Sequence, residues 1–81
     1  MVTALILMNV RRDAINETAQ ALLELKGVAE VYSIAGEWDL AAMVRVRQNE
    51  DLADLVTGKL LKLDGIQKST TLIAFRAYSN Y

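Results

Sequence analysis

Hydrophobic residues dominate the first ten positions of the chain and alternate with few polar ones. A strand over residues 2–10 would place apolar side chains on both of its faces: Val2, Ala4, Ile6, Met8 and Val10 on one, Leu5 and Leu7 on the other. Apolar side chains on both faces are typical of a central strand that is covered on both sides. The run therefore predicts a strand in the middle of a sheet.

Two later stretches show helical spacing. Residues 13–25 carry Asp13 as the expected N-cap and Gly27 as the stop, with an apolar stripe of Ile15, Ala19, Leu22 and Leu23. The second stretch begins at Asn49 as the expected N-cap and ends at Gly65, with a stripe of Leu52, Leu55, Val56, Leu60 and Leu63. Small polar residues before an apolar stripe and a glycine after it mark the two ends of a helix.

Three further runs have the character of strands, over residues 28–35, 38–47 and 66–76. The first of them is mixed in polarity, as expected of an edge strand. The motif Leu25-Lys26-Gly27-Val28 returns 38 positions later as Leu63-Asp64-Gly65-Ile66, so two βαβ units follow one another. We expect an α+β, ferredoxin-like βαββαβ sandwich in which the first and third strands are central and both helices cover one face of a four-stranded antiparallel sheet.

An 81-residue chain is one small domain, here residues 1–81, and 53% of its residues are hydrophobic. A domain of this size buries only ~60% of the surface that its unfolded chain exposes. With helices on one sheet face only, the other face would leave several large apolar side chains in water, each worth ~1.5–3 kcal/mol on full burial. Face-to-face packing of two copies in a dimeric α+β barrel arrangement is favoured over a monomer.

Composition excludes several kinds of function. The chain has no cysteine and no histidine, which excludes disulfides, thiolate or imidazole metal sites and histidine-based catalysis. We expect no metal and no cofactor. Nine basic residues scattered among ten acidic ones give a net charge of −1, which argues against direct nucleic-acid binding. The first ten residues resemble neither a signal peptide nor a membrane span, so a cytoplasmic protein is expected.

Glycine, two acids and the single tryptophan are gathered in the hairpin at residues 35–39. Glu37 and Asp39 are chemically able to act as acid and base or to bind a hard cation weakly. From spacing alone, a solvent-facing Glu37 and an Asp39 that accepts backbone amides are preferred. Arg11-Arg12 either holds an anion near a helix start or is a solvated pair, and the second is favoured. Gly58-Lys59 lacks the flanking residues of a phosphate loop and is expected to be structural, in mid-helix.

Asp39 is nevertheless unusual, because a carboxylate at the start of a central strand needs polar partners. Ser69, Thr70 and Thr71 supply hydroxyls on the last strand, and Thr71 is expected to approach the hairpin when protomers assemble. A small zwitterion would fit there, its carboxylate on backbone amides near Gly36 and its ammonium on Asp39.

Four segments together resemble the effector-binding module, called RAM, of Lrp/AsnC (feast/famine) transcriptional regulators. They are Gly36-Glu37-Trp38-Asp39, Arg45-Val46-Arg47, Leu63-Asp64-Gly65-Ile66 and Ser69-Thr70-Thr71-Leu72-Ile73. The likeness covers essentially the whole chain. It departs from the family pattern at Ala35, where a hydroxyl residue is usual, at Trp38 in place of Tyr or Phe, and at Asp64 in place of proline, a loop change expected to matter little. With no helix-turn-helix before Val2, a stand-alone module is expected.

The resemblance implies a non-enzymatic module that senses an amino acid and takes part in transcriptional regulation of amino-acid metabolism. It implies sheet-to-sheet dimers, larger rings such as octamers, and co-assembly with full-length regulators, with no direct contact to nucleic acid or membrane. By position the effector would be held by Gly36, Asp39 and Thr71, with Ser33, Trp38 and Ile73 lining the site. The alternative is a small enzyme of the dimeric α+β barrel type that uses Glu37, Asp39 or Tyr32. The tail, residues 77–81, is expected to be frayed or docked on a partner.

Overall fold

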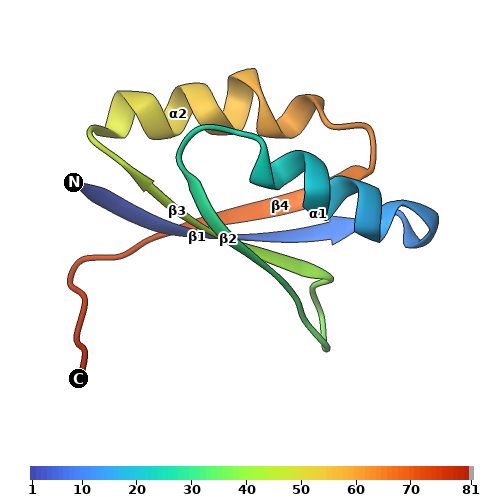
Figure 1. The fold of residues 1–81 in the computed structure, drawn as a ribbon, viewed down its shortest axis with the longest axis horizontal. Coiled ribbons are helices and arrows are strands. Elements are labelled where there is room, and N and C mark those ends of the chain that lie inside the picture. Colours follow the sequence, from blue (N-terminus) through green and yellow to red (C-terminus); the bar gives the residue numbers. More distant parts are fainter. Residues whose placement is uncertain (81) are drawn as a thin grey trace.

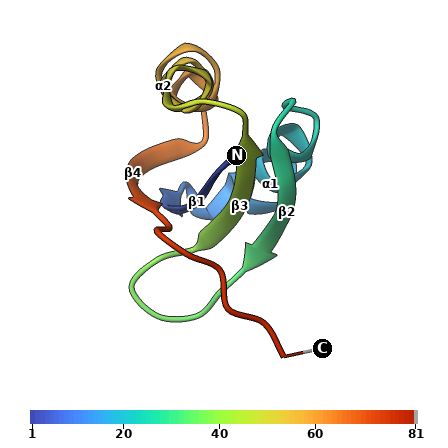
Figure 2. The ribbon, with the colours of Figure 1, turned by 90° about the vertical axis from the view of Figure 1, so that its left-hand side faces the viewer.

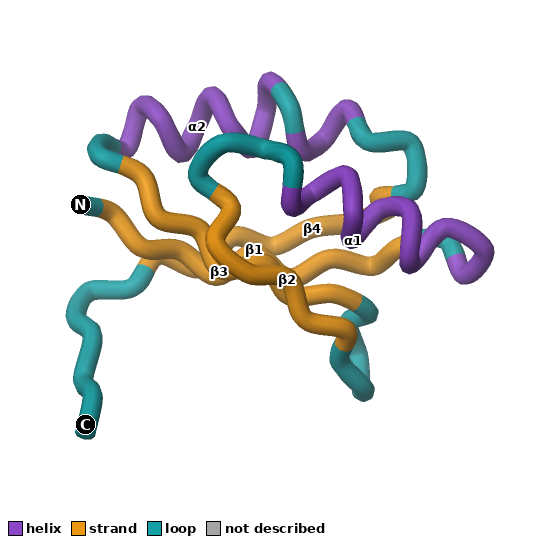
Figure 3. The backbone as a smooth tube through the Cα atoms, in the orientation of Figure 1, coloured by secondary structure: helices purple, strands orange, loops and turns teal. Residues whose placement is uncertain are grey.

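The computed structural model describes residues 1–80, which form a four-stranded antiparallel sheet and two α-helices (Figures 1 and 3). The strands are β1 (Val2–Val10), β2 (Val28–Ser33), β3 (Leu40–Val46) and β4 (Ile66–Ile73), and the helices are α1 (Ile15–Leu23) and α2 (Asn49–Gly58). Short 3₁₀ turns span Arg12–Ala14 and Leu60–Lys62. The sheet order is β2-β3-β1-β4, so the predicted α+β ferredoxin-like fold, with the first and third strands central and the second at an edge, is confirmed.

Both helices lie on the same side of the sheet (Figures 1 and 2). Every second residue of β1 and β3 faces them, so the period of two places one set of side chains in the core. The buried core consists of Ala4, Ile6, Met8, Val10, Ala14, Leu22, Leu40, Ala42, Val44, Leu52, Leu55 and Leu60. No helix within residues 1–80 is both long and apolar enough to cross a membrane.

The opposite face of the sheet, which we call the open face, has no helix over it (Figure 1). Strand register places Leu5 between Met43 of β3 and Leu72 of β4, a row of three large apolar side chains across the sheet. Leu7 lies in the next row, opposite Ala41. Strand β1 therefore does present apolar residues on both faces, as its sequence predicts.

The start of α1 differs from the prediction. The helix begins at Ile15, its N-cap residue is Ala14, and no side chain caps it. The Asp13 carboxylate instead accepts a hydrogen bond from Arg11 Nε at 2.8 Å, so the predicted Asp13 cap is wrong. Leu23 is exposed, because the helix ends there, while Thr18 takes an unpredicted buried place on the inner face.

The N-cap residue of helix α2 is Gln48 rather than Asn49, and the Asp51 carboxylate accepts a hydrogen bond from the Gln48 backbone amide at 3.2 Å. The helix ends at Gly58, so Gly58-Lys59 lies at a helix end and not in mid-helix. Strands β2, β3 and β4 are shorter than predicted: β2 ends at Ser33, β3 starts at Leu40, and β4 ends at Ile73. Beyond β4 the chain extends away from the sheet (Figure 1), and Tyr81 lies outside the described residues.

The two glycines of the internal repeat have different reasons to be glycine. Gly27 adopts a φ of +101°, a left-handed conformation that other residues rarely accept. Gly65 has no such φ, but a Cβ there would overlap Thr18 Oγ1 and come within 3.1 Å of Ala14 Cβ. The two copies of the repeat therefore share a position, before β2 and before β4, rather than a backbone conformation.

Candidate ligand-binding site

The β2–β3 hairpin projects from the sheet on the open-face side, away from the helices (Figure 1). Its base is closed by a backbone hydrogen bond from the Ile34 amide to the Asp39 carbonyl, 3.0 Å, and the Asp39 amide attaches it to β1 by donating to the Met8 carbonyl at 2.9 Å. At its turn Gly36 has a φ of +120°, and a Cβ there would meet nothing within 4 Å. The loop thus needs glycine for its backbone conformation and leaves open space around it.

The half-buried Asp39 side chain is fixed at the end of β1. Its Oδ2 accepts a hydrogen bond from the Val10 amide at 2.9 Å. That amide is available because the pairing of β1 with β3 ends at Met8 and Leu40, so Val10 lies beyond the last paired residue of β3. Asp39 does accept a backbone amide, but from another strand and not from its own turn. Among residues 1–80 its other oxygen, Oδ1, makes no hydrogen bond or ion pair.

Two further contacts hold the hairpin against the sheet. Asn9 Nδ2 donates to the Glu37 carbonyl at 2.8 Å. The Lys68 ammonium lies 5.5 Å from the centroid of the Trp38 ring, within the range of a cation–π interaction. Asn9 and Lys68 are register partners on β1 and β4, so the loop is attached to two strands besides its own.

Asp39 lines a cavity of about 450 Å³ at this end of the sheet. The other lining residues come from the end of β1, the turn into α1 and the start of β4: Asn9, Val10, Arg12, Ile15, Gln67 and Lys68. We call this space the hairpin cavity. It offers two cations, one carboxylate, two side-chain amides and an apolar wall, and its volume lies within the ~300–1,000 Å³ of small-molecule sites.

Of the six residues expected to form a ligand site, only Asp39 lines the hairpin cavity. Gly36 and Trp38 belong to the same loop, and Ser33 ends β2 opposite Leu40. Thr71 and Ile73 lie opposite Ile6 and Ala4, farther along β4 than Lys68 and away from the hairpin. A single protomer therefore does not bring Thr71 to Asp39, and their meeting across protomers remains a prediction.

Sequence reasoning missed Asn9, Gln67 and Lys68 as cavity-lining residues, and it favoured a solvated position for Arg12, which also lines the cavity. The first three fall in strands and carry no motif: the pairing of β1 with β3 brings Asn9 to Asp39, and the pairing of β1 with β4 brings Gln67 and Lys68. A signal did exist for Arg12, since the Arg11-Arg12 pair stands out in the sequence.

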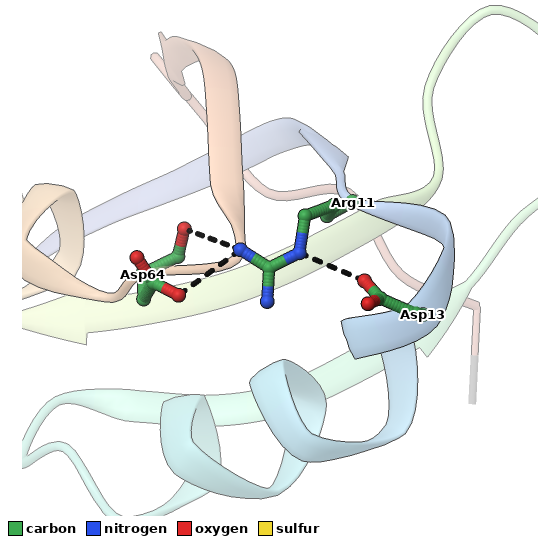
Figure 4. Close-up of polar contacts among 3 residues, drawn as sticks. All are labelled: Arg11, Asp13 and Asp64. Carbon is green, nitrogen blue, oxygen red and sulfur yellow. Dashed lines mark hydrogen bonds and ion pairs between the residues drawn. The ribbon is translucent and has the colours of Figure 1, made fainter.

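Arg11 has a different role from its neighbour. Its Nε bonds Asp13 at 2.8 Å and its Nη1 bonds Asp64 Oδ2 at 3.0 Å, so one guanidinium joins two carboxylates (Figure 4). The hydrogen bond and charge of Arg11 lower the pKa of Asp13, and the two carboxylates raise the pKa of Arg11. Asp64 is thus more than a neutral loop change, because it joins the β4 approach to the end of β1.

The residues of the enzyme alternative do not gather in one site. Tyr32 lies on β2 opposite Ala41, and neither it nor Glu37 lines the hairpin cavity. A hydrogen bond and the charge of Glu30 raise the pKa of Tyr32, which makes its phenolate harder to form. Within residues 1–80 no three acidic side chains gather as a metal site would require. A second cleft, of about 640 Å³, lies between the end of β3 and α2 and contains none of the expected residues.

Known proteins agree with this fold and place the chain in a family. A structure from Thermus thermophilus, TTHA0845, has 44% sequence identity and a TM-score of 0.92, covering 99% of this chain and 100% of that one. AsnC of E. coli has the same fold at 22% identity, with a TM-score of 0.91 over 99% of this chain and 54% of AsnC. The regulator LrpA of Pyrococcus horikoshii is 34% identical over 61 residues, 75% of this chain and 43% of LrpA.

The chain spans less than half of the length of the curated relatives that it matches. These relatives are described as HTH-type transcriptional regulators. The family model for the Lrp/AsnC ligand binding domain matches residues 3–81. The chain belongs to the Lrp/AsnC ligand-binding domain family.

Proposed function

We propose that residues 1–81 form one non-enzymatic domain that senses an amino-acid effector and, as an oligomer in the cytoplasm, takes part in transcriptional regulation of amino-acid metabolism. The observation that carries this proposal is the position of Asp39. In a chain of this family, the Asp39 side chain lines a cavity of ligand size. One of its carboxylate oxygens accepts a hydrogen bond from the protein, and the other has no partner among residues 1–80.

The chemistry of the hairpin suits the polar end of an amino acid. A half-buried carboxylate that is hydrogen-bonded on one oxygen remains a good acceptor for an ammonium group on the other. Open space around Gly36 lets a ligand approach the backbone there. A transcriptional regulator of the same fold from Neisseria meningitidis, 18% identical, has been solved as a complex with L-Met. We propose Gly36, Asp39 and Thr71 as effector contacts, with Ser33, Trp38 and Ile73 around them.

We propose that two copies pack through their open faces. The Met43–Leu5–Leu72 row and the neighbouring Leu7 supply an apolar surface that a second sheet would remove from water. The hairpin and the C-terminal tail project from opposite ends of this side of the sheet (Figure 1). Larger rings would bring Thr71 of one protomer to the hairpin of another, and co-assembly with full-length regulators would couple the effector to DNA.

Calorimetric titration and thermal shift against a panel of the common amino acids test the sensing function. An effector present at ~100 times its Kd should stabilise the fold by ~2.7 kcal/mol. Asp39→Asn should remove most of that stabilisation, because its amide keeps an acceptor for the Val10 amide but loses the charge that holds an ammonium group.

Asp64→Asn serves as the matched control, since this exposed carboxylate lies outside the hairpin cavity. It should leave binding unchanged. If no amino acid stabilises the protein, or if Asp39→Asn binds as well as the parent chain, the sensing function is wrong.

A further inference from the structure

Resting on the proposed function, we infer that the effector of the hairpin cavity is an amino acid with an anionic side chain, held by Arg12 and Lys68 as well as by Asp39. The cavity brings these three charged residues together from the turn before α1, the start of β4 and the β2–β3 hairpin. Which ligand the cavity selects depends on whether these three charged side chains already form ion pairs within the protein.

Arg12 is the available member of the arginine pair. Its neighbour Arg11 is held by Asp13 and Asp64 and does not line the cavity (Figure 4). Arg12 lines the cavity and forms no ion pair among residues 1–80. A guanidinium in this position presents a fork of donors that matches a carboxylate.

Lys68 is held at the other side of the same space. Its ammonium is 5.5 Å from the Trp38 ring, so the side chain is directed toward the hairpin. Within residues 1–80 it forms no ion pair with Asp39, although both line the cavity. The two opposite charges therefore line the same cavity without neutralising each other in an ion pair.

The charges of the cavity do not balance. Arg12 and Lys68 contribute two positive charges and Asp39 one negative charge, which leaves one positive charge over. A neutral zwitterion would pair its carboxylate and its ammonium and leave that excess. An amino acid with a second carboxylate has a net charge of −1 and neutralises it. Complementary charge of this kind chiefly determines which ligand is selected.

Isothermal titration with L-glutamate, L-aspartate, L-glutamine and L-asparagine tests this selection, because each acid has an amide of nearly equal shape. One acid should bind at least ~10-fold more tightly than its amide, since hydrogen bonds to a charged group are about twice as strong as neutral ones. The preference should shrink as salt is raised from about 50 to about 500 mM, roughly a threefold shortening of the Debye length.

Arg12→Gln and Lys68→Gln should each weaken binding of the acid by about tenfold or more and bring the ratio of acid to amide affinity toward one. Arg47→Gln, at the opposite end of the sheet, is the matched control and should change neither. Far-UV circular dichroism and thermal melting of each variant verify that it folds.

The outcomes separate the two proposals. Binding of an amide or an apolar amino acid as tight as that of the acids overturns the inference and leaves the sensing function standing. An acid preference that Arg12→Gln and Lys68→Gln leave intact also overturns it, because the acid then binds elsewhere. Absence of binding by every amino acid overturns both.

Discussion

Arg11 and Arg12 are identical and adjacent, yet their surroundings differ completely. Arg11 joins Asp13 and Asp64, which belong to segments far apart in the sequence. Arg12 faces the hairpin cavity. Arg11, Asp13 and Asp64 are all exposed, so their ion pairs contribute little to stability. They do shift the pKa values of Asp13 and Arg11.

The pKa of Asp13 provides a test of this cluster. In Arg11→Gln it should rise toward its ordinary value of 3.8, because the hydrogen bond and the charge that lower it are both lost. A carboxyl whose folded pKa lies below its unfolded pKa stabilises the fold above the unfolded value and loses that effect as pH falls through the folded one. Arg11→Gln should therefore show a smaller loss of stability between about pH 5 and about pH 2.

NMR titration of the Asp13 carboxyl carbon measures the shift directly, and urea unfolding at the two pH values measures its effect on stability. Arg12→Gln is the control and should leave the Asp13 pKa where it is. An unchanged Asp13 pKa in Arg11→Gln would show that the ion pair does not form in solution.

At the scale of elements, α1 packs closely against the approach to β4. Gly65 is buried there, and its carbonyl accepts the Arg11 amide at 2.8 Å. A methyl group at Gly65 would overlap Thr18 Oγ1 on α1. Helix and strand can approach this closely only because one of the two facing positions has no side chain.

Gly65→Ala should therefore destabilise the fold by about 1–3 kcal/mol through overpacking. Combining it with Thr18→Ala should recover part of that loss, since the hydroxyl it meets is gone. Gly58→Ala is the control, because nothing lies within 4 Å of a Cβ at that helix end. Urea unfolding measures all three, and a neutral Gly65→Ala would mean that α1 moves aside freely.

The central strands could be predicted from the sequence, whereas the helix starts and most of the site residues could not. Apolar residues on both faces of β1 predict its central position, because such a strand must be covered on both sides, and the βαββαβ order predicts that β3 is central too. Helix starts are harder to predict, because neighbouring polar groups compete: Arg11 takes the Asp13 carboxylate, and Gln48 caps α2 one residue before Asn49. For the site, its place at the start of a central strand singles out Asp39, whereas Arg12 reaches it from the turn after β1 and Lys68 only through the pairing of β1 with β4.

The whole molecule has one covered and one open sheet face, and its last residues add further exposed apolar surface. The Leu72 side chain is 48% exposed, and Phe75 and Tyr78 beyond β4 are almost fully exposed. A chain of 81 residues has little core to offset such exposure. The proposed association of copies through the open face would cover these side chains together.

Leu72→Lys should shift the oligomer toward monomer, because a charge buried within a sheet-to-sheet contact would lose its hydration. Leu23→Lys is a matched control: that leucine is 46% exposed, on α1 in the other layer. Light scattering and analytical ultracentrifugation at micromolar concentration distinguish the two. Dissociation by Leu23→Lys instead would place the contact on the helices, and a monomeric parent chain would exclude the open face.

The end of β1 makes a single hydrogen atom a reporter of the site. The Val10 amide lies beyond the last β1–β3 pair and donates to the Asp39 carboxylate, so its exchange with deuterium depends on that side chain. A ligand bound to the remaining oxygen would hold the carboxylate in place and slow the exchange at Val10. A ligand that pulled the carboxylate away would accelerate it, so the direction of the change tells how Asp39 takes part in binding.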